Sequence, residues 1–132
     1  MSELKYRRVW WVMGVAWLVL VIYLSVGDFT LPQVEFSFGD KVNHLIAYGF
    51  LMGWFGQLEK SILKRLLIAV LLIIMGLALE LIQGSLPHRW FDWFDAAANT
   101  LGVVIALVLF RFGADNILAW FLTQVLSKGK VN

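Results

Sequence analysis

The sequence predicts an all-α membrane protein with four transmembrane helices, both termini in the cytoplasm and an amphipathic C-terminal helix in the membrane interface. Of its 132 residues, 61% are hydrophobic and only 15% are charged, against about half and about a quarter in soluble domains. Four separate apolar runs set the number of spanning helices. A chain this short forms one domain and cannot bury so much apolar surface in water. The composition therefore excludes a soluble enzyme, a nucleic-acid-binding module and a disordered chain.

Each apolar run is long enough to cross a bilayer as a helix. The first would extend over about 27 Å, which is close to the thickness of the hydrocarbon core. It is longer than the core of a typical signal peptide, and no A-x-A-like cleavage site follows it, so we interpret it as a retained helix. The four predicted spans are residues 9–26, 42–58, 66–86 and 93–110, in a single transmembrane domain of residues 1–132.

The last apolar stretch, residues 115–127, is too short to span. Asn116, Thr123 and Ser127 would share one face of a helix, and apolar residues cover the rest. This pattern predicts a helix lying in the membrane interface. A frayed continuation of the fourth span is the alternative.

The basic residues predict the orientation of the chain. With four spans, the N-terminus, the second loop and the C-terminal tail lie on one side of the membrane. The positive-inside rule places that side, and both termini, in the cytoplasm. It holds nine basic residues, namely Lys5, Arg7, Arg8, Lys60, Lys64, Arg65, Arg111, Lys128 and Lys130, whereas the opposite side holds Lys41 and Arg89.

Polar residues recur at helical spacing within or near the spans. They form one stripe on each of three helices, because residues three or four apart share a helix face. Tyr48, Glu80 and Asn99, one from each helix, would lie at a similar depth, about 9 Å below the outer surface. If the helices pack together, the stripes meet in a cavity open to the outside. The stripes are Asp40, His44 and Tyr48; Glu80 and Gln83; and Asp92, Asp95, Asn99 and Gly102.

The energetics of the bilayer single out Glu80. An acid well inside a span costs about 2.5–3.5 kcal/mol on insertion scales, so an intramembrane ionisable residue is a candidate functional group. Glu80 must be neutral, paired or facing water, and Arg89, His44 and Lys41 are its available partners. The structural alternative is a polar network that ties helices together at about 1 kcal/mol per contact.

Small residues favour contact between the second and fourth spans. Gly49 and Gly53 form a GxxxG pattern on one, and Ala98, Gly102 and Ala106 repeat the spacing on the other. Such faces let helices approach closely. The competing use of the same faces is homo-oligomerisation.

The polar residues also carry a resemblance. The pattern D-K-x-x-H-x-x-x-Y, then E-x-x-Q, then P-x-R-x-x-D-x-x-D-x-x-x-N-x-x-G resembles the VanZ-like family across roughly residues 40–110. The resemblance implies a small multi-pass protein of the bacterial cytoplasmic (inner) membrane. The family takes its name from a protein associated with resistance to teicoplanin. It therefore implies a context in the cell envelope, with possible ligands among envelope lipids, lipid-linked precursors and glycopeptides, but no reaction.

Three functions follow from the residues. As a binder, the site would hold an anionic lipid, a lipid-linked envelope precursor or a glycopeptide-related ligand, with Lys41 and Arg89 on its anionic group. As an enzyme, it would use Glu80 and His44 as acid and base, while Asp95 and Asn99 orient them. A transporter is disfavoured because the inner half of the spans lacks polar residues. The remaining lining residues would be Asp40, Tyr48, Gln83 and Asp92.

No cofactor or metal is predicted. The chain has no cysteine, which excludes disulfides, thiolate metal sites and a cysteine nucleophile. Glu80, Asp92, Asp95 and Asn99 would offer oxygen ligands to a cation, but no spacing among them is diagnostic of a metal site. The expected partners are membrane lipids or lipid-linked precursors, and not nucleic acid.

Overall fold

The protein is all-α over the residues that the structure describes. The computed structural model describes residues 7–27, 39–87 and 89–129. The basic residues Lys5 and Lys130, which enter the orientation argument, lie outside these ranges. The elements are α1 (Arg7–Val26), α2 (Gly39–Gln57), α3 (Ile62–Ser85), α4 (Trp93–Phe110), a 3-10 turn η1 (Ala114–Asn116) and α5 (Ile117–Lys128).

The helix bounds differ from the sequence prediction mainly at α2 and α3. α4 covers the predicted residues, whereas α2 starts three residues early and α3 starts at Ile62 rather than residue 66. Charged residues bound the apolar run in α3, but they do not bound the helix. Lys64 and Arg65 are good helix formers and continue α3 beyond the apolar stretch. Asp40 occupies the first turn of α2, where a negative charge complements the helix dipole.

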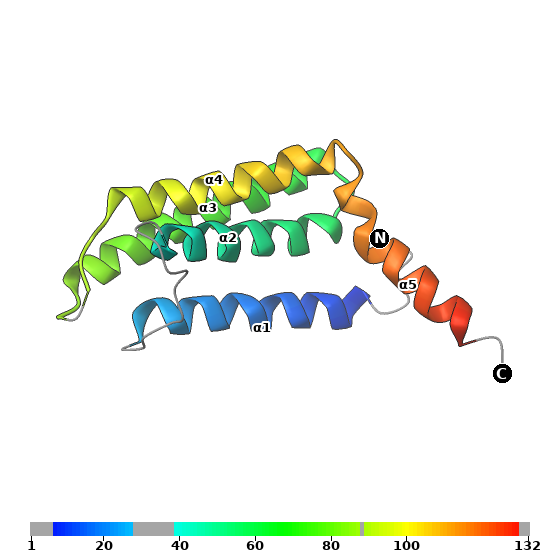
Figure 1. The fold of residues 1–132 in the computed structure, drawn as a ribbon, viewed down its shortest axis with the longest axis horizontal. Helices are drawn as coiled ribbons and strands as arrows, with labels where there is room; N and C mark the ends of the chain where they lie inside the picture. Colours follow the sequence, from blue (N-terminus) through cyan, green and yellow to red (C-terminus); the bar gives the residue numbers. More distant parts are fainter. Residues whose placement is uncertain (1–6, 28–38, 88, 130–132) are drawn as a thin grey trace.

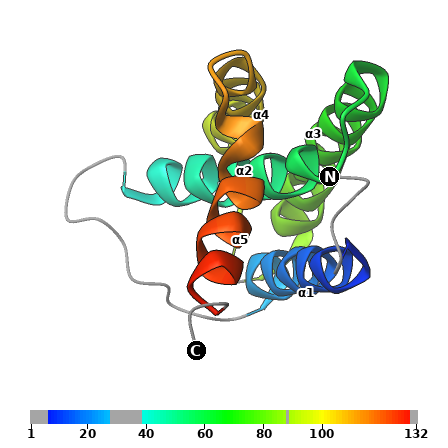
Figure 2. The same ribbon diagram turned by 90° about the vertical axis from the view of Figure 1, so that its right-hand side faces the viewer.

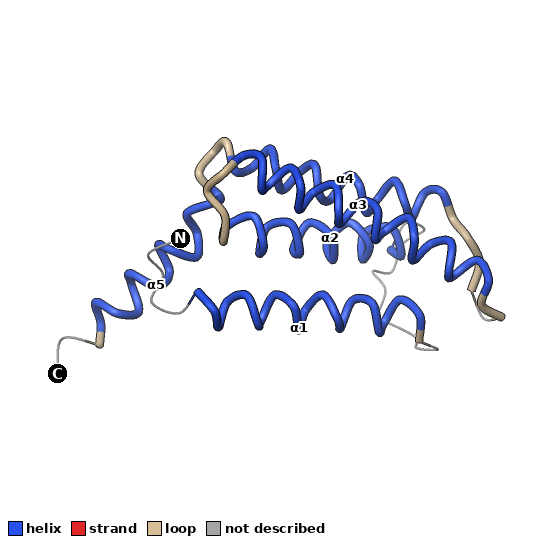
Figure 3. Tube along the Cα trace, turned by 180° about the vertical axis from the view of Figure 1, so that it is seen from behind, coloured by secondary structure: helices blue, strands red, loops and turns tan. Residues whose placement is uncertain are grey.

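The first four helices run side by side and alternate in direction (Figure 1). α2 lies between α4 and α1 in both the side view and the end view (Figures 1 and 2). It packs chiefly against α4 and also contacts α1 and α3. α5 leaves the end of α4 at an angle to the other helices (Figure 3). α2 is therefore the innermost helix of the arrangement.

Three helices, α1, α3 and α4, are long and apolar enough to cross a membrane. They expose many large apolar side chains, including Val12, Leu63 and Leu101, as expected for surfaces that face lipid. α2 has 19 residues, but its first turns carry Asp40, Lys41, Asn43 and His44. These polar residues are partly buried, because α2 packs against α1, α3 and α4. This composition is that of a multi-pass membrane protein.

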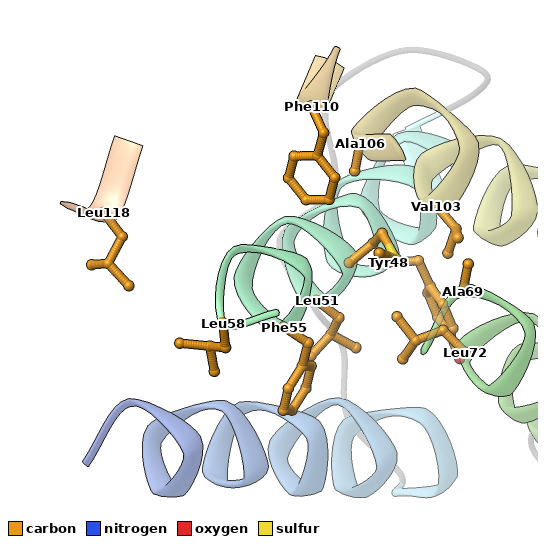
Figure 4. Packing of buried hydrophobic residues seen from close by; sticks show 11 residues of the cluster. Tyr48, Leu51, Phe55, Leu58, Ala69, Leu72, Val103, Ala106, Phe110 and Leu118 are labelled. Atoms are coloured by element: carbon orange, nitrogen blue, oxygen red, sulfur yellow. The ribbon is translucent and has the colours of Figure 1, made fainter. Parts of the chain in front are cut away.

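The apolar core lies along α2. Leu51, Met52 and Val103 are completely buried, and Phe55 points toward α1 while Tyr48 points toward α3 (Figure 4). The predicted contact between the second and fourth helices is confirmed at Gly102. A Cβ atom there would overlap the carbonyl oxygen of Leu45 and lie 2.9 Å from the backbone nitrogen of Gly49.

Charged residues connect several elements at the end of the fold where α2 ends and α3 begins. The Arg65 guanidinium donates to the carbonyl oxygens of Gly56 (3.0 Å) and Glu59 (2.8 Å) and to Asp115 Oδ2 (3.0 Å). Arg7 pairs with Glu59 Oε1 at 2.6 Å. The start of α1, the α2–α3 loop and η1 therefore meet at one end. Several basic residues that predict orientation also hold this end together.

Candidate functional site

Seven of the predicted site residues meet at the other end, where α2 and α4 begin and α3 ends (Figure 1). The first two turns of α2, the last two turns of α3 and the N-cap and first two turns of α4 supply them, because antiparallel helices bring these ends together. We call this group the polar cluster. Its members are Asp40, Lys41, His44, Glu80, Asp92, Asp95 and Asn99.

Lys41 connects the carboxylates at the outer end of the cluster. Its Nζ atom lies 2.6 Å from Asp92 Oδ2, 2.8 Å from Asp95 Oδ1 and 3.7 Å from Asp40 Oδ2. Asp92 also caps α4 by accepting a 2.8 Å hydrogen bond from the Phe94 N–H. The hydrogen bond from Lys41, followed by the one from Phe94, holds the pKa of Asp92 below its usual value. The Lys41 ammonium group is therefore already paired with carboxylates of the protein.

His44 occupies the centre of the cluster. Its Nδ1–H donates to Asn99 Oδ1 at 2.9 Å, since a carbonyl oxygen can only accept. Its Nε2 atom faces Asp95 Oδ2 at 3.5 Å and Asp40 Oδ1 at 3.9 Å. Asn99 thus orients the ring so that Nε2 points at two carboxylates.

Glu80 closes the inner side of the cluster. It is 1% exposed, its Oε1 lies 3.9 Å from His44 Nδ1, and its Oε2 accepts a 3.4 Å hydrogen bond from the Asp92 N–H. Exposure rises outward, to 17% for the His44 side chain and 47% for that of Asp40. The cluster therefore opens at Asp40 and ends at Glu80.

Tyr48 lies beside the cluster in the apolar core. It is almost completely buried, and a Cβ atom at Gly76 would be 3.1 Å from its ring and 3.2 Å from Asn99 Nδ2. The sequence analysis did not single out Gly76. It could have been recognised as a glycine four positions before Glu80, on the same face of the helix.

Gln83 and Arg89 bind α1 instead of facing the cluster. Gln83 Nε2 donates to the Ser25 carbonyl oxygen at 2.8 Å. Arg89 Nη2 donates to the carbonyl oxygens of Leu24 (3.2 Å) and Gly27 (3.0 Å), which are acceptors left open at a helix C-terminus. The expected role of Arg89 on an anionic ligand thus has no support in this arrangement.

The electrostatic balance of the cluster is negative. Four carboxylates surround one ammonium group and one imidazole. A phosphate or carboxylate ligand placed here would meet like charges at close range. The arrangement suits a proton, a cation or a group that donates hydrogen bonds. Asp40, His44 and Asp95 can offer one ligand atom each, all within 4.8 Å of one another.

A separate groove of about 510 Å³ lies between α3 and α4. Its lining residues on α4, such as Ala97 and Val104, lie on the side of that helix away from Asp95. Apart from Thr100, the lining is apolar. The groove suits hydrocarbon and is distinct from the polar cluster.

Three helices long and apolar enough to cross a membrane, together with a cluster of ionisable groups at one end of the fold, define the class of protein: a multi-pass membrane protein with a partly buried polar cluster. Residues 5–118 match the family described as VanZ/LLP1. The chain belongs to this family, which confirms the resemblance seen in its polar motifs.

A similar protein occurs in a fission yeast. The chain is 34% identical over 95 residues to "Uncharacterized protein C11E3.10" of Schizosaccharomyces pombe, an alignment that covers 70% of this chain and 58% of the yeast protein. The match thus spans little more than half of that relative. No solved structure matches the chain.

Proposed function

We propose that this VanZ/LLP1 protein is a membrane-embedded enzyme whose polar cluster acts on the polar end of a membrane lipid or lipid-linked envelope precursor. The orientation of His44 carries the proposal. Asn99 fixes Nδ1, buried Glu80 lies behind the same nitrogen, and Nε2 faces the open side of the cluster. A histidine held from behind, with its second nitrogen presented forward, is the arrangement used for acid–base chemistry.

The roles of the two predicted acid–base residues then differ. His44 is the group that reaches substrate, because its side chain is partly exposed. Glu80 is a positioning residue, because it is buried behind the ring, with Oε1 3.9 Å from Nδ1. Because Lys41 pairs with three carboxylates and Arg89 binds the end of α1, neither is placed to hold an anionic head group, so a simple anion binder is the weaker alternative.

The proposed setting is a membrane with four spans and both termini in the cytoplasm. The end of the fold that holds Arg7 and Arg65 would face inward, and the polar cluster would face outward. The family resemblance suggests a bacterial cytoplasmic membrane, where teicoplanin-related precursors are candidate substrates. The yeast relative favours a lipid common to both kinds of cell, so phospholipids are tested first.

The orientation can be tested directly because the chain contains no cysteine. Single cysteines are introduced at two exposed positions, Trp90 and Ser127, and labelled in intact cells with an impermeant maleimide. We expect Trp90→Cys to react from outside and Ser127→Cys to react only after lysis. The reverse pattern would contradict the proposed orientation.

Enzymatic activity is tested with purified protein in nanodiscs. Lipid extract from the host membrane is added, and products are identified by mass spectrometry. We expect turnover by the wild type, none by His44→Ala and strong loss in Glu80→Gln. Thr123→Ala on the exposed face of α5 should retain full activity. Wild-type turnover in His44→Ala would rule out the proposed chemistry, and correctly folded wild type that forms no product would favour a binder.

A further inference from the structure

We propose that Asp40, His44 and Asp95 bind a small divalent metal ion of the zinc type, through Asp40 Oδ1, His44 Nε2 and Asp95 Oδ2. The inference rests on the proposed enzymatic site but changes the role of His44, because its Nε2 atom would hold the ion instead of exchanging a proton with the substrate. The residues come from the first two turns of α2 and the first turn of α4.

The spacing of the three atoms fits a metal centre. Zinc holds nitrogen and carboxylate oxygen at about 2.0–2.2 Å, so neighbouring ligands in a tetrahedron lie about 3.3–3.6 Å apart. His44 Nε2 lies 3.5 Å from Asp95 Oδ2 and 3.9 Å from Asp40 Oδ1. All three atoms lie within 4.8 Å of one another, and the carboxylates would close in on the ion to reach tetrahedral spacing. Three protein ligands with a fourth position open are typical of catalytic zinc.

The two carboxylates divide their oxygens between Lys41 and His44. Asp95 places Oδ1 at 2.8 Å from Lys41 Nζ and Oδ2 at 3.5 Å from His44 Nε2. Asp40 does the same, with Oδ2 toward Lys41 at 3.7 Å and Oδ1 toward His44 at 3.9 Å. The oxygens that face His44 are therefore not those that pair with Lys41. Lys41 stands beside the proposed ion and does not occupy its place.

The surroundings of His44 supply the second observation. A histidine that binds metal through one nitrogen usually donates its other N–H to a carbonyl or carboxylate, which fixes the ring. Asn99 Oδ1 accepts from His44 Nδ1 at 2.9 Å, and Glu80 Oε1 lies 3.9 Å from the same nitrogen. Asn99 comes from α4 and is not a ligand, so this support is independent of the three ligand atoms.

The charge of the cluster favours the same conclusion. The cluster holds four carboxyl groups beside one ammonium group. A divalent ion would offset part of their negative charge and would present a local positive charge to the polar end of a lipid, which Arg89 does not provide. An imidazole ligand favours zinc over magnesium, which prefers oxygen.

The test measures metal binding without any lipid substrate. Full-length protein is purified in detergent without a histidine tag, stripped with EDTA and titrated with ZnCl₂ and, separately, MgCl₂ by calorimetry. We expect one equivalent of zinc and weaker magnesium binding. His44→Ala and Asp95→Asn should lower zinc affinity at least about tenfold, and Asn99→Ala about 10–100-fold. Asp92→Asn, which removes a carboxylate from the cluster but not from the three ligands, should lower zinc affinity less than Asp95→Asn.

Several results would overturn the metal site. They are absence of zinc uptake, tighter binding of magnesium than zinc, or equal losses in Asp92→Asn and Asp95→Asn, which would indicate a diffuse acidic surface. If the variants do not fold, X-ray absorption at the zinc edge of the loaded wild type decides, because a spectrum without imidazole rejects His44. His88→Ala is the matched histidine control and should leave affinity unchanged.

The outcomes also separate this inference from the proposed function. Turnover that depends on His44 in protein that binds no zinc would remove the metal and leave the enzyme. Zinc binding at the three residues in protein without turnover would support the metal site and reject the proposed enzyme.

Discussion

Replacing Gly102 by alanine should destabilise the protein at the contact between α2 and α4. The new methyl group would overlap the Leu45 carbonyl oxygen and lie 2.9 Å from the Gly49 nitrogen. Both obstacles are backbone atoms, so the helices must move apart. Overpacking typically costs about 1–3 kcal/mol, and a rigid obstacle places Gly102→Ala near the upper end. Alanine recovers about 1 kcal/mol of helix propensity, which leaves a net loss of about 2 kcal/mol.

Two other glycines on α2 provide matched controls. A Cβ atom at Gly53 has no neighbour within 4 Å, so Gly53→Ala should gain about 0.5–1 kcal/mol from reduced backbone freedom. A Cβ atom at Gly49 would lie 3.3 Å from the Gly102 carbonyl oxygen, which predicts an intermediate effect. The expected order of stability is Gly53→Ala, then Gly49→Ala, then Gly102→Ala.

The assay is reversible unfolding in mixed detergent micelles, followed by the fluorescence of the seven tryptophans. Gly102→Ala should differ from Gly53→Ala by about 3 kcal/mol, the sum of the two opposite effects. It should also weaken the His44–Asn99 hydrogen bond, because these residues lie on the two helices that separate. Equal stability of the three variants would refute the close contact on which the geometry of the cluster depends.

The remaining contacts give three further predictions. Arg89→Gln should speed amide hydrogen exchange at the C-terminal end of α1, because two carbonyl oxygens lose a donor; unchanged exchange would count against this capping role. Arg65→Gln should loosen α5, seen as faster proteolysis after residue 113, while Asp115→Asn should do so less because it keeps the carbonyl contacts of Arg65. Asp92→Asn should retain the α4 cap, whereas Asp92→Ala should lower stability by about a further 1 kcal/mol in the same unfolding assay. The ionised Asp92 carboxylate stabilises the fold above its unfolded pKa, and this part of the stability falls as pH drops through its lowered folded pKa; Asp92→Asn should lack that acid dependence.

The sequence predicts those parts of the fold that depend on periodicity along one helix. The i, i+4 and i, i+3 spacings put Asp40 and His44, or Asp92 and Asp95, on common faces, and the structure places these residues together. Apolar runs indicate where α1, α3 and α4 lie. They set the start of α3 too late because Lys64 and Arg65 are charged yet helical. Charge ends an apolar run without ending a helix.

Hydrogen bonds from side chains to backbone carbonyl oxygens could not be predicted. Arg89 and Gln83 are polar residues beside a polar site, and their sequence positions favour a role in it. Their acceptors are carbonyl oxygens at the end of α1, and every residue carries such an acceptor. No pattern in the sequence distinguishes these carbonyls from others. The proximity of Asp40, His44 and Asp95 could not be predicted for a related reason, because Asp95 joins the other two only through the packing of α4 on α2.

Variants of Glu80 can distinguish a cluster that serves function from a network that only holds the helices together. Glu80→Gln keeps the shape of the side chain and an oxygen that can accept from the Asp92 N–H but removes a buried charge. If the carboxylate serves chemistry, unfolding of Glu80→Gln should cost at least as much free energy as unfolding of the wild type, because a buried charge is itself destabilising. Glu80→Leu also removes the charge, but it leaves the N–H without an acceptor, which should cost about 1–3 kcal/mol. A stable Glu80→Gln that lacks turnover, beside an unstable Glu80→Leu, would show that the charge serves function and the acceptor serves the fold. If Glu80→Gln unfolds as readily as Glu80→Leu, the charge itself holds the helices together, and the structural alternative is correct.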